Sequence, residues 1–412
     1  ILETYSLFHF REETVKHIKT LLLSGFIFVM AIAQAQTTLT WWDYYTDGSS
    51  NEAMNNLITA YQAAHPDVTI ERTSIGFGDL KSSIIQAAAT GTMPDIVIID
   101  NPDHQAMAAQ GALADLTPYI SEWDGNGQYY DGPWSSTIFD GKNYGVPYGS
   151  NATTLYYNVE LLQEAGIEPP KSWDELRTAA QALTTPDRSG FCLSLINTEE
   201  GTFTYLPFLW GNGGDIPDLG GEANVAALTF LNAMMNEDGS IPKDALNWAQ
   251  GDVNNQFMAG KCAMQINGPW QIPGLTAAGL DFTWNVSDWP NNGSPTSILG
   301  GENFAAGAGD NVEAAWDVIS WVTSPENLLP ALITSGYITS RQDLANDPTF
   351  TEDPVTVVFA NQVAVAKARA YGPNYPEISA EIMNMVQGVL AGGVSPKDAA
   401  AATAEIVQPL LP

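Results

Sequence analysis

The fold is constrained most by one short segment, Asp95-Ile-Val-Ile-Ile-Asp100. A strand that is apolar at every inner position has no solvent-facing side, so it belongs inside a parallel sheet that helices cover on both faces. Strand-like and helix-like runs alternate around it, with strands at 38–42 and 68–75 and helices starting at Ser50 and at Asp79. This alternation predicts a parallel α/β lobe.

A second series of the same kind begins at about Thr153, where a strand to Tyr157 is followed by a helix that Gly166 closes. The chain has 412 residues, which exceeds the size at which one hydrophobic core keeps growing. The sequence therefore predicts two α/β lobes. In open α/β sheets a ligand binds beyond the carboxyl ends of the strands, so polar and aromatic residues at those ends are candidates for a site.

The N-terminus has the features of an export signal. Arg11, Lys16 and Lys19 precede an apolar stretch at 21–33, and Ala33-Gln-Ala35 supplies a small-x-small cleavage pattern. We expect residues 1–35 to be a leader that is removed after Ala35, which predicts a periplasmic or secreted protein. The apolar stretch is short for a membrane span. We do not expect the residues before Arg11 to belong to the folded protein.

The charge of the chain is strongly negative. Lys and Arg number 15 against 47 Asp and Glu, which gives a net charge of −32. Such a surface repels polyanions, so we expect no nucleic-acid partner. The acidic residues are not concentrated in one run, and we interpret them mainly as a solubility feature.

Two cysteines, Cys192 and Cys262, follow the leader. An exported protein meets oxidising conditions, so they can form a disulfide, but each also lies in a strand-like run where a free cysteine is an ordinary core residue. The sequence leaves both alternatives open.

Signatures of enzymes are absent from the sequence. We find no zinc-binding His-Glu-x-x-His, no Gly-x-Ser-x-Gly nucleophile turn, no phosphate-binding loop and no Cys-x-x-Cys. We therefore expect no catalytic residue, no metal and no cofactor. Carboxylates are so abundant that a glycosidase pair stays open on counting alone.

A set of motifs occurs in a fixed order: Leu39-Thr-Trp-Trp42, Thr90-Gly-Thr-Met-Pro-Asp-Ile96, Gln110-Gly-Ala-Leu113, Tyr144-Gly-Val-Pro-Tyr148, Pro170-Lys-Ser-Trp-Asp-Glu-Leu176, Gly260-Lys-Cys-Ala-Met-Gln-Ile-Asn-Gly-Pro-Trp270 and Gly392-Gly-Val-Ser-Pro-Lys-Asp-Ala399. Over residues 37 to 410 the chain resembles the extracellular solute-binding proteins of sugar ABC transporters, the maltose-binding-protein-like family. The motif ending at Trp270 is the most specific.

The resemblance implies a periplasmic-binding-protein-like fold of type II, in which two α/β lobes joined by a hinge enclose a ligand cleft. The first lobe would comprise 36–149 plus 300–326, and the second lobe 150–299 plus 327–412. Chain crossings would lie near Ser150, Leu299 and Glu326. The protein would be a monomer.

The resemblance also implies sugar-binding residues. Trp270 would lie beneath a pyranose ring, one face of which is mostly C–H. Asn151 stands where the family has an acidic contact. Asparagine can both donate to and accept from a sugar hydroxyl group, but the difference implies that the bound sugar is not the one best known for the family. The remaining candidates come from strand ends, from the second crossing and from loops that the family brings to the cleft: Trp42, Asp43, Tyr44, Asn101, Asp103, Glu200, Gly301, Glu302, Asn303, Tyr371 and Tyr375.

The function that the resemblance implies is capture of a mono- or oligosaccharide outside the cytoplasm and its delivery to the permease of an ABC importer, without chemistry. Two alternatives remain open. The same fold could bind a polyamine or another cationic solute, which the negative charge would favour, and more remotely the chain could be a secreted glycosidase.

Overall fold

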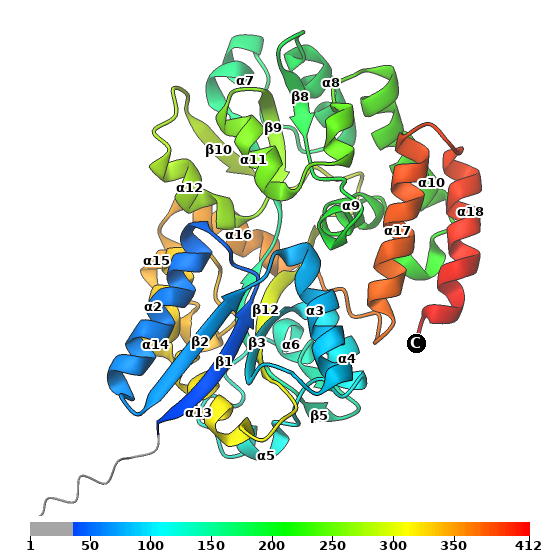
Figure 1. Cartoon of the computed structure of the whole chain (residues 1–412). Coiled ribbons are helices and arrows are strands. Elements are labelled where there is room, and N and C mark those ends of the chain that lie inside the picture. The colour runs from blue at the N-terminus through cyan, green and yellow to red at the C-terminus, as the bar shows by residue number, and fades with distance from the viewer. Residues whose placement is uncertain (1–35) are drawn as a thin grey trace, which may run out of the picture. The chain divides into compact units, whose positions relative to one another are not determined.

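Two main β-sheets organise residues 36–412, the part of the chain that the computed structural model describes (Figure 1). The predicted leader, residues 1–35, lies outside the described residues. Within the described range, no helix combines the length and apolar character that crossing a membrane requires. Strands and helices alternate along this range as expected, so the α/β class is confirmed.

The first sheet has five strands in the order β2-β1-β3-β12-β6. Their bounds are β1 Thr37–Asp43, β2 Val68–Ser74, β3 Ile96–Asp100, β6 Val146–Asn151 and β12 Gly300–Ala306. Strands β1 and β3 are parallel, whereas β12 runs antiparallel to both β3 and β6, so the sheet is mixed and the expectation of a purely parallel sheet is wrong. Ile98 of β3 enters the core on one face of the sheet, and Val97 and Ile99 enter the core on the other. The all-apolar sequence of β3 follows from this burial on both faces.

The second sheet has four strands in the order β10-β7-β9-β8. Their bounds are β7 Thr154–Asn158, β8 Ser189–Cys192, β9 Cys262–Asn267 and β10 Trp284–Ser287. Strand β9 is antiparallel to β7 and parallel to β8. A disulfide between Cys192 and Cys262 joins β8 to β9, which decides between the two alternatives that the sequence left open.

Helices cover both sheets. In chain order they are α2 Gly48–Ala64, α3 Phe77–Thr90, α4 Asn101–Ala109, α5 Thr117–Ile120, α6 Asp131–Ser135, α7 Val159–Ala165, α8 Trp173–Leu183, α9 Glu199–Gly211, α10 Glu222–Asn232, α11 Gln250–Met258, α12 Ile272–Ala277, α13 Val312–Val322, α14 Pro325–Ser335, α15 Pro348–Thr351, α16 Pro354–Val365, α17 Tyr375–Leu390 and α18 Pro396–Val407. Two small sheets, β4 Ile138–Phe139 with β5 Lys142–Asn143 and β11 Ser297–Ile298 with β13 Ala366–Lys367, complete the strands.

The chain passes between the two sheets at three places. It leaves the first sheet between β6 and β7, and it returns between β11 and β12. The third passage comes after α14 rather than near Glu326, because α14 packs against α2 and buries Leu328 and Leu332 in the core of the first sheet. Residues 325–335 therefore stay with the first sheet, whereas the expected boundary assigned residues from 327 onward to the second lobe.

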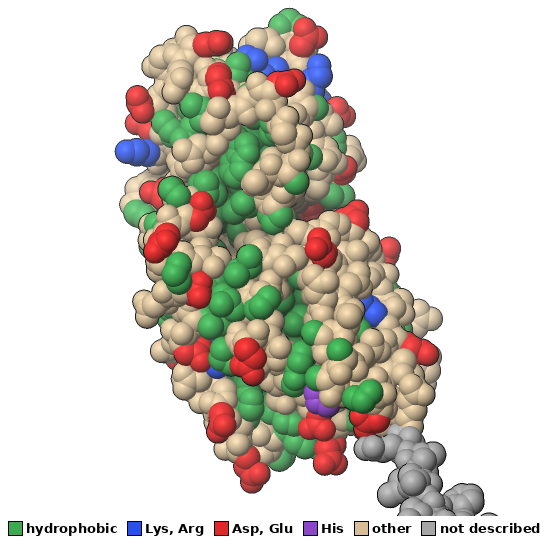
Figure 2. Space-filling view, turned by 90° about the vertical axis from the view of Figure 1, so that its left-hand side faces the viewer, with side chains coloured by type: hydrophobic (Ala, Val, Ile, Leu, Met, Phe, Trp, Pro, Cys, Tyr) green, Lys and Arg blue, Asp and Glu red, His purple; other side chains and the backbone are tan. Residues whose placement is uncertain are grey.

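The surface reflects the composition. On the face shown in Figure 2, acidic side chains are scattered among apolar and uncharged polar ones, and basic side chains are few. The acidic groups on this face do not gather into one groove, which agrees with reading them as a solubility feature.

Candidate ligand-binding site

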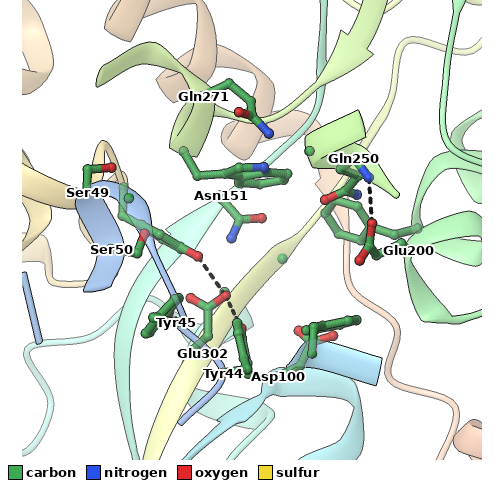
Figure 3. A pocket seen from close by; sticks show the side chains of 18 of the residues that line it. Tyr44, Tyr45, Ser49, Ser50, Asp100, Asn151, Glu200, Gln250, Gln271 and Glu302 are labelled. Carbon is green, nitrogen blue, oxygen red and sulfur yellow. Dashed lines mark hydrogen bonds between the residues drawn. The ribbon is translucent and has the colours of Figure 1, made fainter. Parts of the chain in front are cut away.

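A cavity of about 480 Å³ lies where segments of the two sheets meet. The first sheet contributes the ends of β1 and β3 and the start of β12, and the segments around the second sheet contribute the starts of α9 and α11 and the η4 turn, Pro269–Gln271. Side chains from all of these segments project into the same space (Figure 3). A cavity of this size suits a small organic ligand.

An aromatic platform forms one wall. The ring of Trp270 lies over Gly268, where a Cβ atom would overlap the indole, so glycine at this position lets the ring rest on the backbone. The ring centroids of Trp270 and Phe203 are 6.2 Å apart. Trp270 is only partly buried, so its ring is available to a ligand. Aromatic faces of this kind bind the C–H face of a sugar ring without needing charge.

Glu302 lies on β12 and faces the cavity. Its Oε1 accepts hydrogen bonds from the hydroxyl groups of Tyr44 at 2.5 Å and Tyr337 at 2.9 Å, whereas Oε2 is buried without a partner (Figure 3). Burial, and to a smaller extent the nearby Asp100, raises the pKa of Glu302 from an ordinary 4.5 to about 8, although the hydroxyl groups of Tyr44, Tyr337 and Tyr45 favour the ionised form. The buried Oε2 is a polar atom that a ligand can satisfy.

Asn151 at the end of β6 offers a second unpartnered acceptor. It is 3% exposed, and its Oδ1 is buried without a hydrogen bond. Asn151 pairs with Gly300 across the sheet, and a Cβ atom at Gly300 would overlap Oδ1. The next residue, Gly301, has φ +134°, a conformation that favours glycine. The two glycines therefore let Asn151 lean over β12 toward the cavity.

Arg369 ties the two sheets together beside the cavity. Its guanidinium binds Glu199 Oε1 at 2.5 Å, from the start of α9, and both oxygens of Asp100 at 3.2 Å, from the end of β3. Burial alone would lower the pKa of Arg369, but Asp100 and Glu199 outweigh it and raise that pKa. Asn101 accepts a further hydrogen bond from Arg369 at 3.1 Å. The two carboxylates thus have a cation within the protein.

The remaining polar wall comes from uncharged groups and Glu200. The Glu200 carboxylate accepts from the backbone N–H of Gln250 at 2.6 Å, and burial raises its pKa. Gln250, Gln271, Ser49 and Ser50 line the same space with groups that both donate and accept hydrogen bonds (Figure 3).

The structure brings six of the predicted residues to this cavity: Tyr44, Asn151, Glu200, Trp270, Gly301 and Glu302. Seven others do not line it, for identifiable reasons. Trp42 packs into the core on the other face of the first sheet, and Asp43 is fully buried in an ion pair with Arg72 at 2.6 Å. Asn303 points the other way along β12 and donates to the Ser136 hydroxyl.

The other four are committed to contacts inside the protein. Asn101 binds Arg369, and the hydroxyl groups of Tyr371 and Tyr375 donate to Asp215 and Glu199, respectively. Asp103 pairs with Lys81 at 2.8 Å and lines a smaller neighbouring cavity of about 320 Å³. Burial raises the pKa of Asp103 to about 6.

Sequence reasoning missed several lining residues, above all Arg369 and Glu199. One signal could have found the arginine. The chain has only 15 basic residues, and Arg369 stands between two alanines in Ala366-Lys-Ala-Arg-Ala370, where an arginine among small apolar residues indicates a buried partner. Tyr45 follows Tyr44 at the end of the first strand, so the strand-end rule could have found it. Phe203, Gln250, Gln271 and Tyr337 carry no signal of their own, since each lies next to the cavity only through the fold.

Comparisons with known proteins agree on a family. The family model described as bacterial extracellular solute-binding protein matches residues 56–356. The maltotriose-binding protein of Pyrococcus abyssi is 25% identical, over 82% of this chain and 74% of that protein. A solute-binding protein of an ABC transporter from Thermotoga lettingae, solved with α-D-tagatose, is 26% identical with a TM-score of 0.85, over 91% of this chain and 100% of that one.

A second solved structure, the GacH receptor of Streptomyces glaucescens in unliganded form and with acarbose, is 26% identical with a TM-score of 0.83, over 91% of this chain and 98% of that one. These likenesses confirm the predicted type II periplasmic-binding fold. Since the family model spans well over half of the sequence, the chain belongs to the bacterial extracellular solute-binding protein family.

Proposed function

We propose that this protein captures a mono- or oligosaccharide outside the cytoplasm and delivers it to the permease of an ABC importer, without catalysing a reaction. The observation that carries the proposal is the pairing of an aromatic platform with polar groups around one cavity. Trp270 rests on Gly268 on one side, and Asn151, Gln250 and Gln271 offer donors and acceptors around it. A sugar ring has an apolar C–H face and a rim of hydroxyl groups, so it can contact the aromatic wall and the polar wall at once.

The mechanism that we propose is closure of two lobes on the ligand. The first lobe would comprise 36–149 and 300–335, and the second lobe 150–299 together with the chain from α17 onward, with α16 lying between them. A sugar that bonds to both walls binds the closed arrangement better than an open one, and it therefore shifts the population toward closure. The permease would recognise the closed form, and the leader at 1–35 would direct the chain to its place of action.

The named relatives support this choice among the alternatives. They are described as binding proteins for maltotriose and as receptors solved with a ketose or with acarbose. A linear polyamine would leave the platform of Trp270 unused. The glycosidase alternative finds no support among these relatives, which are named as binding proteins or receptors.

The experiment is a ligand screen with two readouts. Mono- and oligosaccharides are added to the protein, and the melting temperature and the tryptophan fluorescence are recorded. We expect a matching sugar to raise the melting temperature, because it binds only the folded state, and to change the emission of Trp270. The Trp270→Phe variant should keep the thermal shift and lose most of the fluorescence change. A broad panel that produces neither signal would exclude the sugar assignment.

A further inference from the structure

One buried carboxyl group of the described residues has no counter-charge. The buried acids are Asp43, Asp100, Asp103, Glu199 and Glu302. Four of them form ion pairs: Asp43 with Arg72, Asp103 with Lys81, and Asp100 and Glu199 with Arg369. Glu302 is 4% exposed and forms none among the residues that the structure describes. Glu302 is therefore the one buried carboxyl group of the described residues that a charged group entering the cavity can still pair with.

Two buried acceptors near Glu302 have no partner, and the neighbouring Tyr45 hydroxyl, which can donate or accept, has none either. Oε2 of Glu302 and Oδ1 of Asn151 are both buried without a hydrogen bond. The two residues lie on the same face of the first sheet, because Asn151 is paired with Gly300, two positions from Glu302 on β12. Both side chains project into the cavity (Figure 3). A ligand group that donates several hydrogen bonds fits this end best.

The cavity as a whole lacks positive charge. Its lining includes five carboxylates, Asp47, Asp100, Glu199, Glu200 and Glu302, against a single basic residue, Arg369, which is held by two of them. A hydroxyl group would satisfy Oε2 as a donor but would leave this charge imbalance unchanged. A protonated amine would satisfy Oε2 and Oδ1 and would also supply the counter-charge.

We infer that the sugar bound in this cavity carries a basic amino group, which contacts Glu302 and Asn151 while its ring lies against Trp270. This inference rests on the proposed sugar-binding function and adds the ligand's charge to it. Burial holds the carboxyl of Glu302 largely protonated in the empty cavity, since its pKa is about 8, and an entering ammonium group would favour the ionised form.

The test is calorimetric titration with sugars that differ only at the nitrogen. Glucosamine and its β-1,4-linked oligomers are compared with their N-acetylated forms and with glucose and its β-1,4-linked oligomers. We expect the amino forms to bind at least about tenfold more tightly than both sets of neutral counterparts, as a charge-assisted hydrogen bond predicts. The isosteric Glu302→Gln variant should lose this preference, whereas Glu122→Gln, a change in an exposed carboxylate outside the cavity, should keep it.

The outcomes separate the two proposals. Neutral sugars that bind as tightly as their amino counterparts would overturn the amino-sugar inference and leave sugar binding intact. A preference for amino sugars that survives in a folded Glu302→Gln protein would overturn the role of Glu302. Binding of spermidine but of no sugar, or binding of none of these probes and no sugar of the wider screen, would overturn both proposals.

Discussion

Two groups of carboxylates line the cavity, and they differ in how their charge is compensated. On one side Asp100 and Glu199, from different sheets, share Arg369. On the other side Glu302 has only the tyrosine hydroxyl groups of Tyr44 and Tyr337. A satisfied ion-pair cluster holds structure together, whereas an unsatisfied buried acceptor is available to a ligand. We therefore propose that the Arg369 cluster serves the architecture of the site and that Glu302 serves recognition.

The largest expected effect comes from removing the shared cation. Arg369→Met leaves two buried carboxylates without a partner, which should cost about 3–5 kcal/mol in the free energy of unfolding. Urea denaturation measures this loss. Lys367→Met is the matched control, because the Lys367–Asp215 pair is 40% exposed on each side and should contribute less than about 1 kcal/mol. Equal stability of the two variants would contradict the structural role of the Arg369 cluster.

A second loss of stability should leave recognition untouched. The disulfide between Cys192 and Cys262 links residues 70 positions apart, and its removal in the Cys192→Ser/Cys262→Ser protein should cost about 2–4 kcal/mol. Neither cysteine lines the cavity, so ligand affinity measured below the melting transition should stay within twofold, roughly the scatter expected for a distant site. A large change in affinity would show that stability and recognition are not separable here.

The platform should affect binding more than stability. Trp270→Ala removes a partly buried ring from the cavity wall, and it should weaken sugar binding by about 1–3 kcal/mol, as measured by calorimetry. Trp321→Ala is the control, since Trp321 packs against Tyr61 in the first lobe and does not line the cavity. If the two variants bind alike, Trp270 is not the platform.

The smallest expected effect is a pH-dependent one at Glu302. Between pH 4.5 and about 8 the folded protein keeps a proton on Glu302 that the unfolded chain releases, so this group lowers stability as pH rises through that window. Glu302→Gln removes the penalty, so its melting temperature should gain on that of the wild type as the pH rises from 5 to 8. Tyr44, Tyr337 and Asp100 face Glu302 and stay in place in both proteins. A difference that does not change with pH would contradict the raised pKa.

Local sequence patterns predicted the elements well where one physical requirement dominates. The all-apolar strand ending at Asp100 indicated a central position in the sheet, and it lies there. Met54, Leu57, Ile58 and Tyr61 recur at helical spacing, and α2 buries all four. The position of Trp270 at the cavity came instead from the family resemblance of the motif that ends there.

The rest of the site depends on long-range pairing that no local pattern contains. Arg369 meets Glu199 and Asp100 across 170 and 269 residues of sequence, respectively. Some acidic residues at strand ends form ion pairs inside the protein and others face the cavity, and the two kinds look alike in sequence. Asp43 is held by Arg72 inside the first lobe, whereas Glu302 faces the cavity, and only the fold distinguishes them.

The most direct test of the central claim is a crystal structure of the protein with a sugar that raises its melting temperature. We expect the sugar ring in the cavity, stacked on Trp270, with a polar group within hydrogen-bond distance of Glu302 Oε2 and Asn151 Oδ1. A sugar bound outside the cavity, or bound inside it without contact to Trp270 and Glu302, would contradict the account.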